Sequence, residues 1–359
     1  MICPLAPNPY PHLMKYPTIA ITGINAVDNP GPGTGIARSL RENPEFPVQI
    51  IGLAYDAMEP GLYMDWLFDR RYIMPYPSAD IEVFMDRIQQ IQEEFGLDCI
   101  IPNFDVELPL YIRYAKELEA LGIRTYLPNK AQFSLRNKAK LAEVAQNFGL
   151  LTPETIVVTS PKELEEATAK LKFPLMIKGP YYKAYRVSSQ GEAVQRFYPL
   201  VAEWGYPIIL QKIITGIELN LVGVGDGKGG HLGLVAIKKM GVTELGKIWS
   251  GLTIHHPGLI KAAEKFLQNT QWKGPFELEC IADQDGAIYL LEINPRFPAW
   301  TYFATGVGIN LPSRLVQAAL GLPLSPIEAY SAGKLFMRYT YELVMDATPL
   351  QTLVSQGER

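Results

Sequence analysis

The segment FELECIADQDGAIYLLEINPR, residues 276–296, decides how the centre of this chain folds. Two apolar runs flank Asp285–Gly286, and Asp-Gly between such runs is the strongest short-range signal for a β-hairpin. A two-residue type I′ turn, with positive φ at both central residues, places Glu279 directly opposite Glu292. The sequence therefore predicts an antiparallel hairpin that brings two carboxylates together.

Side chains alternate across a strand, so one face of this hairpin is polar and the other is apolar. The apolar face is expected to pair Leu278 with Ile293, Cys280 with Leu291 and Ala282 with Tyr289. The polar face carries Glu277, Glu279, Glu292, Asn294 and Arg296. Opposed carboxylates repel each other, and a Mg²⁺ ion held by carboxylate oxygens with an amide beside it would relieve that repulsion. A solvated sheet face that happens to carry acids is the alternative.

Composition indicates a globular chain without a general affinity for polyanions. The 359 residues are 48% hydrophobic and 19% charged, with a formal net charge of −4. This length suits two or three domains, and the acidic balance gives no reason to expect a nucleic acid as partner. Three cysteines without a CxxC motif fit a reducing cytosol, and we expect a cytoplasmic protein. Residues 1–17 do not resemble a signal peptide, and we expect no membrane span.

Strands and helices alternate over the first third of the chain. Buried-strand patterns occupy 18–22, 48–53 and 99–102, and helical patterns occupy 36–41, 81–95 and 106–121. This alternation predicts a parallel α/β sheet in a first domain, residues 17–128, after an extended segment at 1–16.

The pattern then changes. A helix at 138–148 precedes strand patterns with few helices between them, at 155–158, 175–178, 208–211, 219–224, 232–238 and 334–344. This pattern predicts an α+β region with an antiparallel sheet that includes the acidic hairpin. Residues 346–359 are expected to form a loose C-terminal tail.

A glycine-rich loop follows the first predicted strand. Gly31, Gly33 and Gly35 are spaced GxGxG rather than GxGxxG, and prolines interrupt them. Asp56 lies about where a ribose-binding acid would fall in a dinucleotide-binding fold. A tight strand-to-helix turn explains the loop better than NAD binding does, although NAD binding stays an alternative.

The run Leu291–Arg296, preceded by a strand that carries Glu279, resembles the ATP-grasp superfamily. It looks most like the branch that includes the carbamoyl-phosphate synthetase large chain, biotin carboxylase and amino-acid ligases. The resemblance implies a Rossmann-like pre-ATP-grasp domain at 17–128. A two-lobed ATP-grasp domain would follow at 129–345, with its small lobe at about 151–213. The implied cofactors are ATP and Mg²⁺ or Mn²⁺.

The resemblance also implies roles for individual side chains. Glu279, Glu292 and Asn294 would hold metal ions on the ATP phosphates, and Arg296 would face the transferred phosphate. Lys178 and Lys238 would assist Arg296 as catalytic groups. The residues expected to contact the nucleotide are Lys138, Lys178, Lys183, Gln211, Lys212, Ile213 and Glu218.

One segment departs from the family pattern. The loop that covers the phosphates is usually rich in glycine and serine, whereas residues 179–187 read GPYYKAYRV. Lys183 or Arg186 is expected to supply charge there in place of backbone amides.

The expected activity is ATP-dependent carboxylate–amine or peptide ligation through an acyl-phosphate, with release of ADP and phosphate. Its substrates would be small molecules or peptides, and the sequence leaves a homo-oligomer open. Two alternatives are a non-catalytic ATP-binding or scaffolding module, which the unusual loop at 179–187 suggests, and an NAD-dependent dehydrogenase. Asp105 and Glu107 could bind a substrate amine or cap a helix, and His255 and His256 are expected to be structural or near a substrate.

Overall fold

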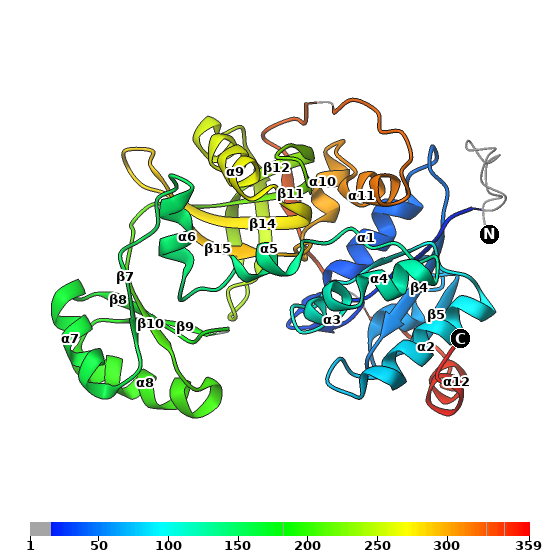
Figure 1. The fold of residues 1–359 in the computed structure, drawn as a ribbon, viewed down its shortest axis with the longest axis horizontal. Coiled ribbons are helices and arrows are strands. Elements are labelled where there is room, and N and C mark those ends of the chain that lie inside the picture. The colour runs from blue at the N-terminus through cyan, green and yellow to red at the C-terminus, as the bar shows by residue number, and fades with distance from the viewer. Residues whose placement is uncertain (1–15, 182, 328, 341) are drawn as a thin grey trace.

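The computed structural model describes residues 16–181, 183–327, 329–340 and 342–359. Figure 1 shows three parts along the longest axis: a small lobe with its strands at 155–212, a central large lobe with its strands mainly at 217–294, and a first domain that contains the strands at 49–54 and 70–73. The first domain has a parallel sheet and the two lobes have antiparallel sheets, which confirms the predicted mixture of α/β and α+β. Within the described residues, no helix is both long and apolar enough to span a membrane.

The first domain is a parallel sheet with helices on both faces. Its strand order is β5-β4-β1-β6. Alternate residues of β1 point to opposite cores: Ile19 and Ile21 pack with Ile36 of α1, and Ala20 packs with Phe84 of α2. The main elements are β1 (Thr18–Ile21), α1 (Pro32–Arg41), β4 (Gln49–Ala54), β5 (Arg70–Ile73), α2 (Ile81–Glu94), β6 (Cys99–Ile101), α3 (Leu108–Arg113) and α4 (Ala115–Ala120). Minor elements are β2 (Ala26–Val27), β3 (Asn29–Pro30) and η1 (Pro60–Tyr63).

Two helices of this domain differ from the predicted ranges. α1 begins at Pro32 instead of Ile36, because proline suits the first turn, where no intrahelical hydrogen bond is lost. The single helix expected at 106–121 is broken at Tyr114 into α3 and α4.

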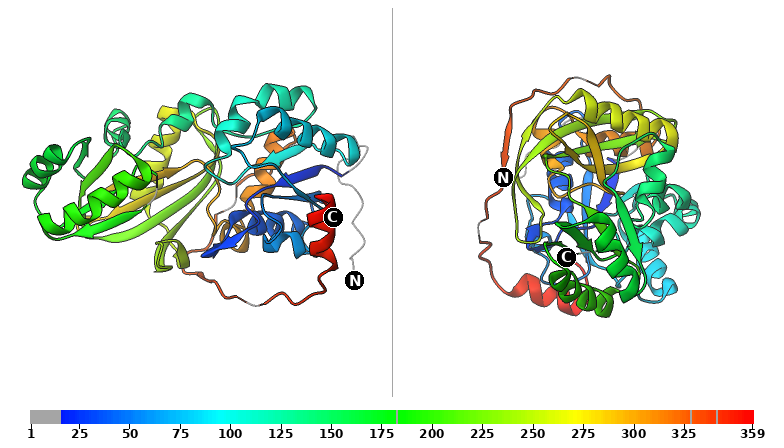
Figure 2. Two further views of the ribbon diagram at one scale, coloured as in Figure 1. Left: turned by 90° about the horizontal axis from the view of Figure 1, so that it is seen from below. Right: turned by 90° about the vertical axis from the view of Figure 1, so that its left-hand side faces the viewer.

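The expected loose tail is instead an ordered part of the first domain. Residues Thr348–Gln356 form α12, and Leu353 of this helix is fully buried in the core. The last residues pair with the edge strand β5: Arg71 N donates to Arg359 O at 2.7 Å, and Ile73 N donates to Gly357 O at 2.7 Å. Figure 2 shows α12 beside the first domain, after a long connection from the large lobe.

The small lobe is a four-stranded antiparallel sheet with two helices on one face. Its strand order is β7-β10-β8-β9. Its elements are β7 (Thr155–Val158), α7 (Pro161–Leu171), β8 (Leu175–Lys178), β9 (Ala184–Val187), α8 (Gln190–Trp204) and β10 (Ile208–Lys212). The helices pack on Leu175, Ile177 and Leu210, which leaves the other sheet face toward the large lobe.

The large lobe is a six-stranded sheet in the order β15-β14-β11-β12-β13-β16. The strands are β11 (Ile217–Asp226), β12 (His231–Val242), β13 (Ile248–Thr253), β14 (Lys273–Ala282), β15 (Ile288–Asn294) and β16 (Leu335–Met337). The helices of this part are α5 (Lys130–Ser134), α6 (Leu141–Asn147), α9 (Pro257–Thr270), α10 (Tyr302–Gly306) and α11 (Leu311–Ala319). α6 is shorter than the predicted helix 138–148, so Lys138 lies in the turn before it.

The hairpin of β14 and β15 has the predicted pairing at its acidic end. Glu279 is opposite Glu292, Glu277 is opposite Asn294 and Leu278 is opposite Ile293. Toward the turn the prediction is wrong by one residue, because Cys280 is opposite Leu290 and Ala282 is opposite Ile288.

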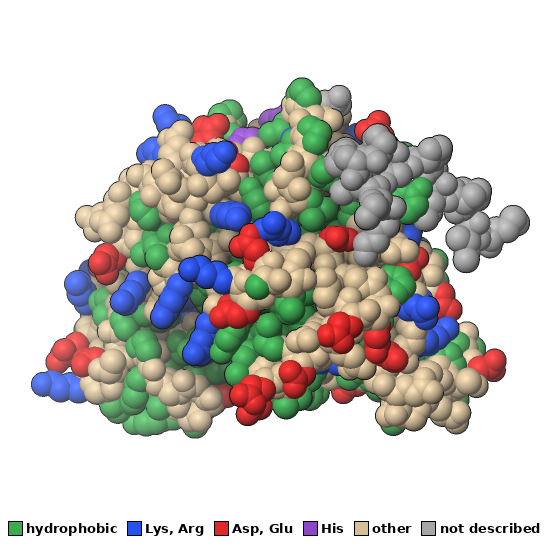
Figure 3. Space-filling view, turned by 45° about the vertical axis from the view of Figure 1, so that its right-hand side comes forward, with side chains coloured by type: hydrophobic (Ala, Val, Ile, Leu, Met, Phe, Trp, Pro, Cys, Tyr) green, Lys and Arg blue, Asp and Glu red, His purple; other side chains and the backbone are tan. Residues whose placement is uncertain are grey.

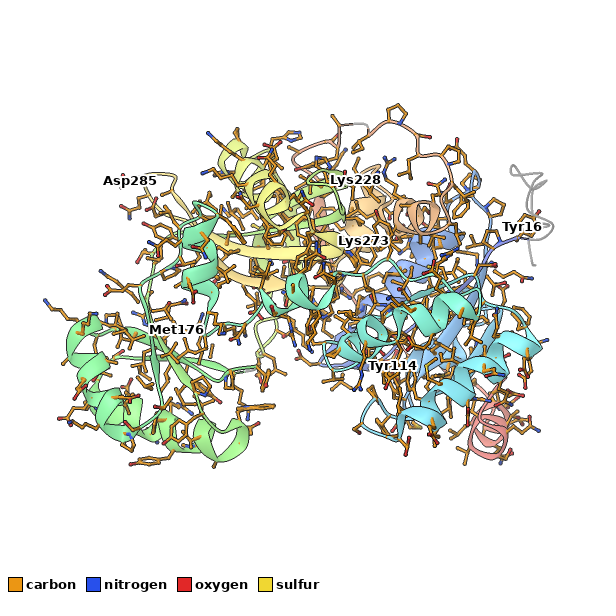
Figure 4. All side chains as sticks on the ribbon, viewed as in Figure 1. Tyr16, Tyr114, Met176, Lys228, Lys273 and Asp285 are labelled. Atoms are coloured by element: carbon orange, nitrogen blue, oxygen red, sulfur yellow. The ribbon has the colours of Figure 1, made fainter. Side chains whose placement is uncertain are left out.

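Two local features compensate to give this register. The turn is longer than two residues: Asp283 N donates to Ala287 O at 3.0 Å, and φ is positive at Gly286 (80°) but not at Asp285. A bulge at Leu291 then adds one residue to β15 before Glu292. Asp285 lies at the outer tip of this turn (Figure 4). The extra turn residue and the bulge together keep Glu279 and Glu292 in register.

The first domain and the large lobe share one hydrophobic core. Ile36 and Leu40 of α1 belong to the same buried cluster as Val235 of β12 and Leu311 of α11. The small lobe instead has a separate cluster around Phe197 and Leu210. The chain therefore contains one large packed unit and one smaller unit with its own core.

Candidate functional site

The acidic face of the hairpin is organised around Glu277 and Asn294. Nδ2 of Asn294 donates to Glu277 Oε2 at 3.0 Å and to Glu279 Oε1 at 3.1 Å. Glu277 Oε1 also accepts from Asn220 Nδ2 at 2.8 Å and from Trp300 Nε1 at 2.7 Å. Burial, with a contribution from the nearby Glu279 carboxylate, raises the pKa of Glu277 to about 7. Glu277 is thus a buried acceptor that orients Asn294, and it is not open to a ligand.

Two lysines from different elements approach the opposed carboxylates. Lys138 Nζ lies 3.1 Å from Glu292 Oε1, and Lys239 Nζ lies 3.5 Å from Glu279 Oε2 and 2.8 Å from Glu218 Oε2. Burial raises the pKa of Glu292, the Lys138 ammonium opposes this shift, and the Glu279 carboxylate adds to it. Burial lowers the pKa of Lys239, but Glu279 and Glu218 outweigh burial and leave that pKa raised. The repulsion expected between the two glutamates is therefore partly offset by these cations.

The lysine of β12 at this site is Lys239, and the prediction of Lys238 needs correction. Lys238 pairs with Leu219, whose side chain lies in the apolar core on the other face of the sheet. Adjacent residues of a strand point to opposite faces, so Lys238 faces away from Glu279. Side-chain alternation along β12 does not by itself tell which of the two lysines faces Glu218. The choice depends on how β12 is aligned with β11, and local spacing does not show that alignment.

The small lobe contributes Lys178 and Gln211 from neighbouring strands. Lys178 Nζ donates to Gln211 Oε1 at 2.6 Å, and Gln211 Nε2 donates to Thr155 Oγ1 at 3.1 Å. Burial lowers the pKa of Lys178 to about 8, against the opposing attraction of Glu292. The ammonium of Lys178 is close enough to the acidic hairpin for the carboxylates of Glu292 and Glu279 both to act on its pKa.

The loop after β8 also contacts the large lobe. Lys138 Nζ donates to Tyr181 O at 2.9 Å while it pairs with Glu292. Lys138 therefore links the small-lobe loop to the acidic hairpin. Figure 3, turned by 45° from the view of Figure 1, shows several Lys and Arg side chains gathered on one part of the molecular surface, with acidic side chains beside them.

Other predicted nucleotide-binding residues lie at the edge of this arrangement. Lys183 is exposed, and its ammonium pairs with Glu203 of α8 at 2.6 Å. Lys212 is exposed at the end of β10, and Ile213 is half-buried in the segment that follows. Glu218, on β11, joins the site through Lys239.

Arg296 is held by an acid from the first domain. Its Nε and Nη2 each lie 3.1 Å from Asp105 Oδ2, and Nη1 of Arg136 lies 3.2 Å from Asp105 Oδ1. Glu107 is fully buried and accepts from the backbone N of Asn103 and Phe104. The observed contacts of these acids differ from the two expected roles. Asp105 pairs with two arginines, and Glu107 makes no side-chain capping hydrogen bond to α3 and instead shapes the loop that carries Asp105.

The two adjacent histidines have structural roles. His256 Nδ1 accepts from Leu259 N at 3.2 Å and caps α9. The ring of His255 lies 4.8 Å from that of Tyr330.

Close packing accounts for the glycines of the loop after β1. A Cβ on Gly33 would lie 2.3 Å from Thr22 O, and one on Gly31 would lie 2.3 Å from Gly23 O. Asp56, the residue considered for ribose binding, accepts from Met58 N in a local turn. The loop is therefore a tight strand-to-helix connection, and nothing in it favours a dinucleotide.

The protein side chains at the hairpin supply few ligands for a cation. Among the residues that the structure describes, no group of three or more His, Cys, Asp or Glu side chains is arranged to hold a metal ion. Glu279, Glu292 and Asn294 carry side-chain oxygens on one face of the hairpin.

Comparison with known proteins identifies the class of fold. A family model described as "ATP-grasp in the biosynthetic pathway with Ter operon" matches residues 230–341. The large chain of carbamoyl phosphate synthase from Pyrococcus furiosus is 24% identical over 251 residues, which cover 64% of this chain and 24% of that protein. The chain thus spans about a quarter of the length of the curated relatives it matches.

Two solved structures have the same overall fold. The biotin carboxylase domain of Hydrogenobacter thermophilus 2-oxoglutarate carboxylase, a dimer with MgADP, ADP and bicarbonate, superposes with a TM-score of 0.65 at 18% identity. The match covers 86% of this chain and 70% of that one. The L-amino acid ligase of Bacillus licheniformis has a TM-score of 0.62 at 20% identity, over 85% and 74% of the two chains.

These structural likenesses show the fold, a two-lobed architecture behind a parallel α/β domain. The chain is thus similar to ATP-grasp proteins in its fold and, over residues 230–341, in its sequence.

Proposed function

We propose that this protein is an ATP-dependent ligase that joins a carboxylate to an amine or a peptide through an acyl-phosphate. The reaction would release ADP and phosphate. The observation that carries the proposal is the approach of Lys138 and Lys178 to the opposed carboxylates of Glu279 and Glu292. A metal-bound triphosphate needs cations for its phosphate oxygens and carboxylates for its metal ion, and these residues supply both.

Mg²⁺ or Mn²⁺ fits the hairpin by the chemistry of its donors. Glu279 and Glu292 offer carboxylate oxygens in direct register. Nδ2 of Asn294 faces Glu277 and Glu279, which leaves Oδ1 as its coordinating atom. A cation held there would neutralise phosphate charge during transfer. Two carboxylates and one amide leave coordination positions for phosphate oxygens and water.

The nucleotide would lie between the two lobes. Lys178 and Gln211 present polar atoms from the small-lobe face, and Lys138 reaches both Glu292 and the loop after β8. When ATP is bound, Lys138 and Lys178 would exchange carboxylate and amide partners for phosphate oxygens. Glu218, Lys212 and Ile213 line the connection between the lobes and would contact the remainder of the nucleotide.

Arg296 and Lys239 are the groups proposed to face the transferred phosphoryl group. Arg296 follows the metal-binding strand, and Lys239 lies on the same sheet face as Glu279. Both would stabilise the negative charge that develops on the transferred phosphoryl group. The small lobe would exclude water, since an acyl-phosphate otherwise hydrolyses.

The superposed structures support this proposal by what they contain. One holds MgADP and bicarbonate, and another is an amino-acid ligase. We propose small-molecule or peptide carboxylates and amines as substrates, and a homo-oligomer as the working form.

The test is nucleotide binding followed by substrate-dependent turnover. Calorimetry should detect MgATP binding that is lost with EDTA. Release of ADP and phosphate is then measured with pairs drawn from the amino acids and dipeptides. A protein that binds no MgATP and is stimulated by no pair contradicts the proposal.

A second candidate is a nucleotide-binding module without ligase activity. The loop at 179–187 has few glycines, and Lys183 is paired with Glu203 rather than directed toward the site. MgATP binding without stimulation by any substrate pair would favour this function.

A further inference from the structure

Asp105 lies where three parts of the chain meet. It follows β6 of the first domain, Arg136 follows α5, and Arg296 follows β15 of the large lobe. Asp105 Oδ2 lies 3.1 Å from both Nε and Nη2 of Arg296, and its Oδ1 lies 3.2 Å from Nη1 of Arg136. The side chain of Asp105 is only 12% exposed, so water screens these ion pairs less than it screens pairs on the surface.

The loop that carries Asp105 is itself fixed from within. Glu107 Oε1 accepts from Asn103 N at 2.6 Å and from Phe104 N at 2.9 Å. The buried Glu107 also accepts from the hydroxyls of Thr22 and Tyr55, which follow β1 and β4. The ends of three parallel strands therefore set the position of Asp105. The shared core fixes the position of this domain relative to the large lobe.

This arrangement restricts the guanidinium of Arg296. Asp105 pairs with Nε and Nη2 of Arg296, and Nη1 of Arg296 donates to Phe297 O at 3.3 Å. An arginine side chain otherwise has many rotamers, and fixing one before the ligand arrives lowers the entropy lost on binding. Arg136 balances the charge of Asp105, so the trio keeps a net positive charge for an incoming anion.

We propose that Asp105 is a positioning residue that holds Arg296 ready for the phosphoryl group transferred from ATP. This inference rests on the proposed function, and it assigns to the first domain a part in phosphoryl transfer. The alternative is that Asp105 only joins two parts of the fold. In that case its loss would change stability without a selective effect on phosphate binding.

The test uses inorganic phosphate as the probe, titrated calorimetrically into the full chain saturated with MgADP. This readout needs no knowledge of the acceptor substrate. Asp105→Asn keeps the shape of the side chain and removes its charge. We expect it to weaken phosphate affinity about tenfold or more while MgADP affinity stays unchanged, because a misplaced group loses much of its binding contribution.

Asp65→Asn is the matched control. Asp65 also bridges two arginines, Arg71 at 2.8 Å and Arg359 at 2.9 Å, but lies in the first domain away from the acidic hairpin. We expect wild-type affinity for both phosphate and MgADP in this variant.

A double-mutant cycle separates positioning from stability. Arg296→Gln should itself weaken phosphate binding, and adding Asp105→Asn to it should cause no further loss. Wild-type phosphate affinity in Asp105→Asn, or an equal further loss in the Arg296→Gln background, would overturn the positioning role.

Three other outcomes are also decisive. If Asp105→Asn does not fold, Asp105→Glu replaces it, because the longer acid keeps the charge but moves Arg296; unchanged phosphate affinity there overturns the proposal. If the wild type binds MgADP but no phosphate, the positioning role fails while the nucleotide site stands. If it binds no nucleotide at all, the proposed function itself fails.

Discussion

Two units of the molecule differ in how their hydrophobic cores are built. One unit is the small lobe, and the other, the large unit, consists of the first domain and the large lobe. The small lobe has a core of its own, around Phe197 and Leu210. The first domain and the large lobe are joined by one core that runs from Ile36 to Leu311. A separate core allows a lobe to move or open as a unit, whereas a shared core fixes relative position.

This difference divides the site between the two units. Glu279, Glu292 and Arg296, with Asp105, belong to the large unit, where their distances are set by packing. Lys178 and Gln211 belong to the small lobe and meet the hairpin through polar contacts such as that of Lys138 with Tyr181 O. If the proposed function holds, the groups of the large unit are preorganised and the small-lobe groups proposed to bind the nucleotide close onto them.

The largest expected effects come from breaking each core separately. Leu311→Ala should lower the free energy of unfolding by about 2–5 kcal/mol, and Phe197→Ala should do so by about 3–5 kcal/mol. Scanning calorimetry should show that the first substitution shifts the transition of the large unit and the second shifts that of the small lobe. A single transition that moves equally in both variants would show that the two units unfold as one.

Next in size is Glu292→Gln, which tests the preorganised half of the site. We expect ligase turnover to fall by about a hundredfold or more, because charge stabilisation at the phosphoryl group is lost. The free energy of unfolding should change by less than about 1 kcal/mol, since a partly repelled carboxylate is removed. Asp285→Asn, at the exposed tip of the same hairpin, should keep wild-type turnover. Equal activity in Glu292→Gln would remove this residue from the metal site.

A smaller effect should distinguish the two lysines of β12. Lys239→Met removes the cation near Glu279 and Glu218, and we expect turnover to fall by about tenfold. Lys238→Met, one residue away on the opposite face, should leave turnover close to that of the wild type. Steady-state ADP release under identical conditions measures both, and the reverse ranking would contradict the register of β11 and β12.

The smallest effect is a pH dependence confined to the large unit. Burial raises the pKa of Glu59, in the first domain, to about 7. The folded state keeps this proton where the unfolded chain has lost it, so the stabilisation is complete below about pH 4.5 and is lost as pH rises through 7. We expect a decrease of about 1 kcal/mol between pH 6 and 7.

Glu59→Gln provides the comparison for this effect, because its amide oxygen can still accept from Tyr55 N. Thermal unfolding measured across this pH range should show a flatter profile for the variant. The transition of the small lobe should be the same in both proteins. An unchanged slope in the variant would assign the pH dependence to other groups.

Local periodicity was enough to predict much of this molecule. The α/β alternation of the first domain and the pairing of Glu279 with Glu292 follow from apolar spacing and a turn signal. The same reasoning failed for the turn itself, where a longer loop and a bulge at Leu291 offset each other. Bulges depend on neighbouring segments, and here Leu290 N donates to Leu151 O from outside the hairpin.

The amino-acid sequence by itself determined which residues share a face within each strand and helix, because side-chain direction repeats over two or 3.6 residues. Only the tertiary structure decided which faces meet. It brought Asp105 to Arg296 across 191 residues, chose Lys239 over Lys238, and returned Arg359 to the edge of β5. Such contacts depend on how separate elements pack together. The spacing of residues within one element does not identify partners that lie far away in the sequence.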